Sequence, residues 1–135
     1  MMISTKGRYA LRMMIDFARQ GEDACVPLRE VAERQGISVK YLEQLASLLV
    51  QARILRSVRG PRGGYILSGS AADLKIGDIL RAVEGSCAPV ACLEEGFGEC
   101  PRRKECETIG FWEGLDCVIE NYVDGKVLAE LVTEK

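Results

Sequence analysis

The sequence has no histidine among its 135 residues, and it has only one Trp, four Tyr and three Phe. Without imidazole, no side chain has an unperturbed pKa near neutrality, which excludes histidine acid–base catalysis and histidine metal ligands. No apolar run approaches the ~20 residues that span a bilayer. Residues 1–6 lack the apolar stretch of a signal peptide. We therefore expect a cytoplasmic protein that does not bind membranes and is not an enzyme.

The net charge of −2 at pH 7 is unevenly distributed along the chain. Residues 1–75 contain twelve Lys or Arg and seven Asp or Glu, a net charge of +5. Residues 76–135 contain six Lys or Arg and thirteen Asp or Glu, a net charge of −7. Because the phosphates of a nucleic acid attract clustered positive charge, only the N-terminal part suits a nucleic-acid surface.

The first half of the sequence predicts three helices, because apolar residues recur there at helical spacing between plausible caps. The predicted ranges are about 5–20, 28–35 and 38–51, and Ser4 or Thr5 can cap the first of these helices. Gly36 can adopt the left-handed turn between the second and third helices, and Ser38 is a good N-cap. Ile54–Val58 and Gly64–Leu67 are short, partly β-branched runs separated by Gly and Pro. They predict a two-stranded hairpin.

The second half predicts a helix over Ile76–Val83, which Gly85 ends. The next stretch, residues 86–103, has no periodicity and is predicted to be a loop. A long helix is predicted from about Lys104, followed by a short helix after Gly125.

Two helices joined by a glycine turn and followed by a hairpin are typical of a winged helix-turn-helix, here a mainly α fold with a small β-wing. In the reading helix (about 38–51), Ser38, Lys40 and Tyr41 can reach phosphates. Glu43 and Gln44 can reach base edges, since Gln pairs with adenine and Glu accepts from the cytosine amino group. The alternative interpretation is a helical hairpin with a solvated polar face.

The wing (about 54–67) carries Arg59 and Arg62 on its turn, where long cations can approach a minor groove. Gly60, Gly63 and Gly64 allow its backbone to come close to sugar and phosphate. Together with the uneven charge, the wing favours DNA binding over the alternative.

Four segments of the sequence resemble the IscR-type family of bacterial transcription regulators: residues 5–11, 31–38, 41–45 and 57–65. The resemblance implies a homodimer that binds palindromic DNA operators. It places Ser38, Tyr41, Glu43 and Gln44 in the reading helix, and it places Arg59, Gly60 and Pro61 in the wing. It also implies that Glu43 helps to select between operator classes. Lys40 stands where the family often has a small polar residue, which indicates an extra phosphate contact.

Four of the six cysteines fall in one short stretch: Cys87, Cys92, Cys100 and Cys106. Disulfides are not expected in the cytoplasm, and clustered thiolates favour zinc or an iron–sulfur cluster. The basic run Arg102–Lys104 can lower thiol pKa values and offset cluster charge. Cys117, in the predicted long helix, is expected to pack inside the protein.

The resemblance implies that Cys92, Cys100 and Cys106 bind an iron–sulfur cluster, which we expect to be 2Fe–2S rather than 4Fe–4S. The type member has a histidine where this chain has Ile109, so the fourth ligand stays open. Candidates are Cys87, Glu107, another carboxylate, a ligand from a second subunit or an exogenous thiol. Zinc is the alternative metal.

The long helix carries an apolar stripe that suits a dimer seam, since palindromic sites require two-fold symmetry. Its members are Ile109, Trp112, Leu115, Ile119 and Tyr122. We therefore expect three parts: a winged helix-turn-helix DNA-binding domain (1–85), a cysteine cluster-binding loop (86–106), and a dimerisation helix with a C-terminal helix (107–135).

The predicted function is a DNA-binding regulator that senses iron–sulfur cluster or redox status and controls genes of cluster biogenesis or of cysteine and sulfur metabolism. The alternative is a cluster-free or zinc-binding regulator controlled by a partner protein, such as an enzyme of cysteine metabolism.

Overall fold

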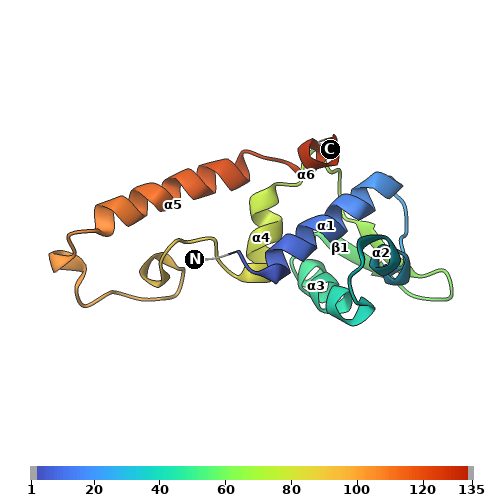
Figure 1. Ribbon diagram of the computed structural model, residues 1–135, viewed down its shortest axis with the longest axis horizontal. Coiled ribbons are helices and arrows are strands. Elements are labelled where there is room, and N and C mark those ends of the chain that lie inside the picture. The colour runs from blue at the N-terminus through green and yellow to red at the C-terminus, as the bar shows by residue number, and fades with distance from the viewer. Residues whose placement is uncertain (1–2, 134–135) are drawn as a thin grey trace.

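The structure is a computed structural model that describes residues 3–133. Its helices are α1 (Thr5–Gln20), α2 (Leu28–Gln35), α3 (Val39–Gln51), α4 (Ile76–Glu84), α5 (Ile109–Asp124) and α6 (Leu128–Thr133). Its strands are β1 (Leu55–Val58) and β2 (Gly64–Leu67), which pair as an antiparallel hairpin. The predicted fold class is confirmed: a winged helix-turn-helix is followed by a long C-terminal helix (Figure 1).

The caps that the sequence predicts are those that the structure uses. The Ser4 hydroxyl accepts from the amide of Lys6 at 3.1 Å and caps α1. The Ser38 hydroxyl accepts from the amide of Tyr41 at 3.1 Å and caps α3. Between α2 and α3, Gly36 is left-handed, with φ 66° and ψ 37°, a conformation that glycine adopts without steric cost.

The hydrophobic core lies where α1, α3, α4 and the base of the wing meet. Met13 and Phe17 of α1 and Leu45 and Leu49 of α3 are all at most 2% exposed. Leu128 of α6 is fully buried in the same core. Each such side chain contributes about 1.5–3 kcal/mol by burial, so this core holds α3 in place from its apolar side.

The wing is attached to this core at its base. Leu55 lies opposite Leu67 in the hairpin, and both side chains are buried. Val26 and Tyr65 exchange two backbone hydrogen bonds of 2.9 Å, which tie β2 to the segment between α1 and α2. A Cβ at Gly64 would collide with the backbone of Val26, so this close approach requires glycine.

A buried carboxylate joins α1 to the helix-turn-helix. Asp16 is 3% exposed and is the only buried charged residue within residues 3–133. Arg34 donates to both of its oxygens at 2.7–3.2 Å, and the Gln35 amide donates at 3.0 Å. Arg12 donates in turn to the side-chain and backbone oxygens of Gln35. These bonds hold the turn at Gly36 against α1.

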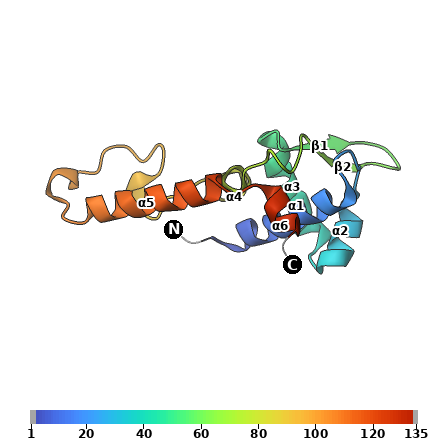
Figure 2. The same ribbon diagram turned by 90° about the horizontal axis from the view of Figure 1, so that it is seen from above.

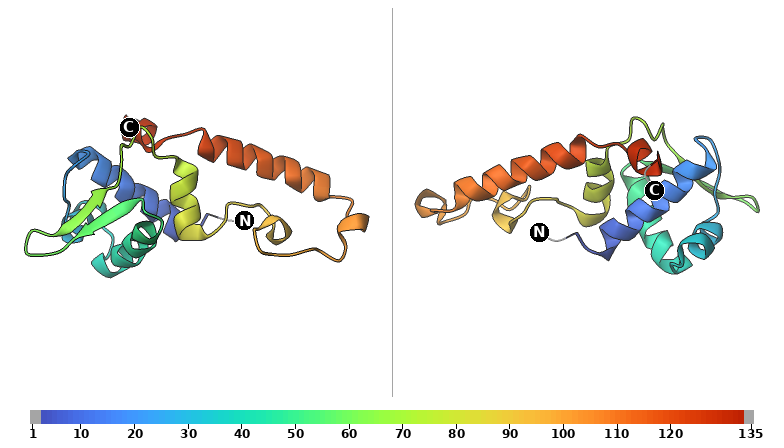
Figure 3. Two further views of the ribbon diagram at one scale, coloured as in Figure 1. Left: turned by 180° about the vertical axis from the view of Figure 1, so that it is seen from behind. Right: turned by 45° about the horizontal axis from the view of Figure 1, so that its top comes forward.

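The long helix α5 extends away from the body, at the opposite end of the molecule from the wing (Figures 1 and 2). None of its residues is buried. After α5 the chain returns to the body (Figure 3), where the amide of Ile76 donates to Lys126 and that of Leu128 donates to Leu74. Within residues 3–133, no helix combines the length and apolar character needed to cross a membrane.

The prediction that the long helix begins at about Lys104 is wrong. Residues Arg103–Glu105 form a short 3-10 helix, η2, and α5 begins at Ile109. Thr108 accepts from Trp112 twice at 3.2 Å, through its backbone oxygen and through its hydroxyl. The helical hydrogen bonds therefore start at Thr108, and Cys106 lies before the helix rather than in it.

Replacing Asp16 with Ala should destabilise the protein by about 1–3 kcal/mol, because Arg34 and Gln35 lose a buried acceptor. The free energy of unfolding, measured by urea denaturation, tests this. The control is Asp23→Ala, which removes an exposed carboxylate from the turn after α1 and should change stability by less than about 0.5 kcal/mol. Equal effects of the two substitutions would contradict the role of Asp16.

Candidate nucleic-acid interface and cysteine loop

The first turns of α3 present the predicted DNA-contacting side chains to solvent. Ser38, Lys40, Glu43 and Gln44 are exposed, and Tyr41 is half-buried. Within the described part of the chain, neither Lys40 nor Glu43 forms an ion pair. The buried side of α3 consists of Leu42, Leu45, Ala46 and Leu49. The exposed side is therefore free to contact a ligand.

Tyr41 is held by α1. Its hydroxyl lies 3.2 Å from the Thr5 hydroxyl, and its ring meets that of Tyr9 edge-on with centroids 5.8 Å apart. The guanidinium of Arg12 lies 5.2 Å from the centroid of the Tyr9 ring. Sequence reasoning missed Thr5 and Tyr9, because both contacts join segments that are far apart in the chain.

The start of α1 is also bound by the end of α4. The Glu84 carboxylate accepts from the amide and hydroxyl of Ser4 and from the amide of Gly7, at 2.6–3.1 Å. A Cβ at Gly7 would lie 2.7 Å from a Glu84 oxygen, so this contact leaves no room for a side chain. Glu84 was not predicted to be a functional residue. The one sequence feature that points to its contact with α1 is Gly7, within the segment 5–11.

The wing projects from the body as an extended turn (Figure 1). Arg59, Gly60, Pro61 and Arg62 are exposed. Gly60 has φ 109°, which favours glycine, and its carbonyl accepts from the amide of Gly63 at 2.9 Å. Neither arginine forms an ion pair with a residue that the structure describes. The turn therefore presents uncompensated positive charge.

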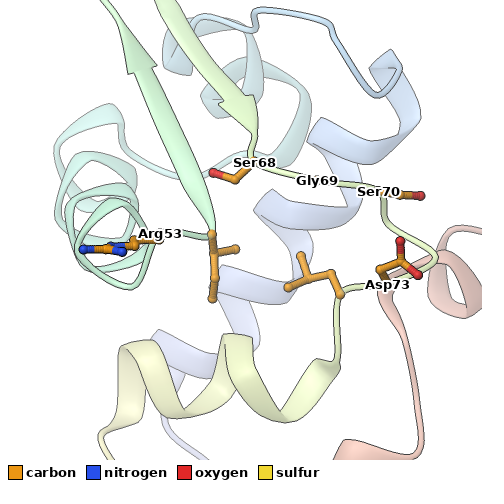
Figure 4. Close-up of a pocket in the computed structure, with 7 residues that line it drawn as sticks. Arg53, Ser68, Gly69, Ser70 and Asp73 are labelled. Carbon is orange, nitrogen blue, oxygen red and sulfur yellow. The ribbon is translucent and has the colours of Figure 1, made fainter.

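A hollow of about 270 Å³ at the base of the wing was not predicted (Figure 4). Arg53 and Asp73 lie on opposite sides of it, with Ser68, Gly69 and Ser70 between them. Arg53 lies two residues after α3 and has a left-handed conformation, with φ 63°. Because its charged groups do not converge, the hollow offers no set of groups for chemistry.

The three predicted cluster ligands lie in the segment between α4 and α5, which runs beside α5 (Figure 2). Cys92 is in a short 3-10 helix, η1 (Ala91–Leu93), and Cys100 and Cys106 flank η2. All three are half-buried free thiols. Within residues 3–133, no three His, Cys, Asp or Glu side chains lie close enough together to hold a metal ion. The structure therefore places the three thiols on one segment without assembling a site.

The environments of the thiols differ. A hydrogen bond with the Thr108 hydroxyl, together with backbone hydrogen bonds, lowers the pKa of Cys106. Burial raises the pKa of Cys87, which is 4% exposed at the end of α4. Glu107, the other named candidate for a fourth ligand, is exposed. The expectation that Cys117 packs inside the protein is wrong, because α5 exposes it to solvent.

An ion pair connects α5 to the body. Arg81 of α4 donates to both Asp124 oxygens at 2.8 Å, and these hydrogen bonds lower the pKa of Asp124. A Cβ at Gly77 would collide with Asp124, so glycine allows the two helices to approach. The pair joins residues 43 positions apart, and no local sequence pattern indicates it.

The remainder of α5 presents apolar side chains to solvent. Phe111, Val118 and Tyr122 are 65–67% exposed. Of these three, only Tyr122 belongs to the predicted stripe. The other stripe members, Ile109, Trp112, Leu115 and Ile119, are half-buried. Large exposed apolar side chains on one element are typical of an interaction surface.

Comparisons with known proteins agree with this architecture. The family profile Rrf2, described as iron-dependent transcriptional regulator, matches residues 3–134. The HTH-type transcriptional regulator IscR of Vibrio parahaemolyticus is 40% identical over 134 residues, which cover 99% of this chain and 79% of that protein. IscR of Escherichia coli O1:K1 is 38% identical over 135 residues, which cover 100% of this chain and 82% of that protein.

Solved structures show the same fold. The structure of CymR, the global cysteine regulator of B. subtilis, matches with a TM-score of 0.78 and 34% identity, covering 98% of this chain and 97% of that one. T. potens IscR matches with a TM-score of 0.73 and 37% identity, covering 98% and 86%. The chain therefore belongs to the Rrf2 family: it is an IscR-like DNA-binding transcription regulator with a winged helix-turn-helix, and it is not an enzyme.

Proposed function

We propose that the protein is a cytoplasmic homodimer that binds palindromic operators through α3 and the wing. The contacting residues are Ser38, Lys40, Tyr41, Glu43, Gln44, Arg59, Gly60 and Pro61. One observation carries this proposal: the exposed polar face of α3 and the wing turn both present cations that no carboxylate of the described chain neutralises. Phosphates are the natural partners of such cations.

The homodimer is proposed to form through α5. The α5 helix has no buried residue, and its side chains Phe111, Val118 and Tyr122 are largely exposed. Packing against its own chain therefore gives this helix little hydrophobic stabilisation. Pairing with a second copy would remove this apolar surface from water. It would also supply the two-fold symmetry that a palindromic site requires.

The signal is proposed to be iron–sulfur cluster or redox status, and the regulated genes those of cluster biogenesis or of cysteine and sulfur metabolism. The IscR and CymR relatives support this assignment. The donor chemistry of Cys92, Cys100 and Cys106 fits an iron–sulfur cluster, because thiolates are the usual ligands of such clusters. We propose the 2Fe–2S type. When bound, such a group would make the loop responsive to iron and oxidants.

The three thiols contribute differently to binding a cluster. The lowered pKa of Cys106 favours its thiolate, the ligating form. Since the loop does not hold the three sulfurs together as a ligand set, binding requires the loop to close around the cluster.

The second candidate function is a regulator without a cluster, or with zinc, that is controlled by a partner protein such as an enzyme of cysteine metabolism. The absence of an assembled ligand set within residues 3–133 favours the form without a cluster or zinc. The similarity to CymR, described as a global cysteine regulator, also supports the second candidate.

Protein prepared without oxygen should be coloured and should contain iron and acid-labile sulfide. Cys92→Ser, Cys100→Ser and Cys106→Ser should each lose most of the visible absorbance, because each removes one thiolate ligand. Cys117→Ser, which removes an exposed thiol of α5, is the matched control and should keep it. A colourless wild-type protein that contains neither iron nor sulfide would support the second candidate.

Arg59→Ala should weaken operator binding and reduce the slope of log affinity against log salt by about 0.9, because one phosphate contact is lost. Fluorescence anisotropy between about 50 and 200 mM salt measures both quantities. The probe is a duplex selected from genomic DNA by the wild-type protein. Lys75→Ala removes an exposed cation directly before α4, outside α3 and the wing, and should change neither. An unchanged slope for Arg59→Ala would contradict the role of the wing.

Val118→Glu should convert the dimer to single chains of 14.9 kDa, because it places a charge on the exposed apolar surface of α5. Sedimentation velocity measures the mass. Glu120→Gln alters a charge on the other side of the same helix and should leave the dimer intact. A Val118→Glu protein that sediments like the wild type would refute the α5 interface.

A further inference from the structure

A groove of about 390 Å³ separates the start of α3 from the wing. Its walls come from three elements: Arg29 at the start of α2, Val39 and Glu43 of α3, and Gly63 and Gly64 at the start of β2. The groove therefore lies between the two parts of the protein that are proposed to contact DNA. The α2 helix is not among the elements from which the contacting residues were predicted.

The groove contains two charged side chains of opposite sign, Arg29 and Glu43. Both residues are exposed. Among the ion pairs of the described residues, neither side chain takes part in one, and the two are not paired with each other within 4.0 Å. Both charges are therefore available to a ligand that enters the groove.

Glu43 alone would oppose DNA binding there. A carboxylate near a phosphate is repelled, and like charges brought together at an interface weaken binding. A cation in the same groove offsets this repulsion. A guanidinium is well suited to the role, because its planar set of donors can bind phosphate oxygens through two hydrogen bonds.

Among the described residues, Tyr65 is the one wing side chain that lines the groove, and it is half-buried beside Phe17. Gly63 and Gly64 contribute only backbone atoms to its wall. A sugar–phosphate strand can therefore lie over the groove with Arg29 on one side and the wing on the other.

We propose that Arg29 binds a backbone phosphate of the DNA strand that lies over this groove, and that it offsets the charge of Glu43 so that Glu43 can select bases. This inference rests on the proposed function, in which α3 and the wing bind DNA. Arg29 is thus a phosphate contact and a positioning residue for operator selection by Glu43.

The test is a double-mutant cycle of Arg29→Ala and Glu43→Gln, with affinity for the selected duplex measured against salt. Arg29→Ala should weaken binding roughly three- to tenfold at low salt and reduce the salt slope by about 0.9. The loss should be smaller in the Glu43→Gln background, where no carboxylate needs to be offset. Arg29→Lys should keep the salt slope, because it keeps the charge.

Lys75→Ala is again the control, and the unfolding curve of each variant shows that it is folded. Unchanged affinity and slope for Arg29→Ala, with Arg59→Ala still weakened, would overturn the inference and leave the proposed function standing. Unchanged binding for both variants would instead refute the proposed DNA interface. Equal losses with and without Glu43 would overturn the coupling between Arg29 and Glu43.

Discussion

The Asp16 carboxylate has almost no access to water, so its charge must be balanced by donors from the protein. Arg34 and Gln35 supply those donors from the last turn of α2. A carboxylate buried without these partners would cost several kcal/mol. The position of α2 relative to α1, and therefore the turn that leads into α3, depends on this one network. The orientation of the polar face of α3 follows from it.

The α1 helix connects the parts of the molecule that would have to communicate in a regulator. Toward its C-terminal end it holds α2 through Asp16, and at its start it holds Tyr41 through Thr5. The same start is bound by Glu84, the last residue of α4, after which the cysteine segment begins. The two ends of the cysteine segment are thus close in sequence to Glu84 and to α5, which Arg81 joins to the body. A shift of the cysteine segment would therefore act directly on α4 and α5, the helices at its two ends.

The sequence was informative where the determinant is local. Ser4 and Ser38 cap helices by accepting hydrogen bonds from backbone amides two or three residues later, and Gly36 ends a helix by its left-handed conformation. The structure confirms these three helix ends. The start of α5 was predicted five residues too early, because charge and polarity near Lys104 resemble a helix start whereas the hydrogen bonds begin at Thr108.

The contacts that assemble the site were not predictable in the same way. The pairs of Arg81 with Asp124 and of Glu84 with Ser4 join distant positions, and pairing at such separations is set by the packing of the whole chain. The cysteines illustrate the same limit. Their residue type indicates thiolate chemistry, but it does not determine whether the loop brings the three thiols together. Within residues 3–133, the three thiols do not form a group of metal ligands.

The hydrogen bond between Thr5 and Tyr41 has a further consequence, because either hydroxyl can donate in it. A phosphate oxygen can only accept. When one binds at Tyr41, the phenolic proton must point outward to it, and Thr5 must then donate to the phenolic oxygen. The two hydroxyls would form an ordered chain of donors ending on the DNA, in which each hydrogen bond polarises the next. Loss of the Thr5 hydroxyl would therefore weaken a contact that Thr5 itself never makes.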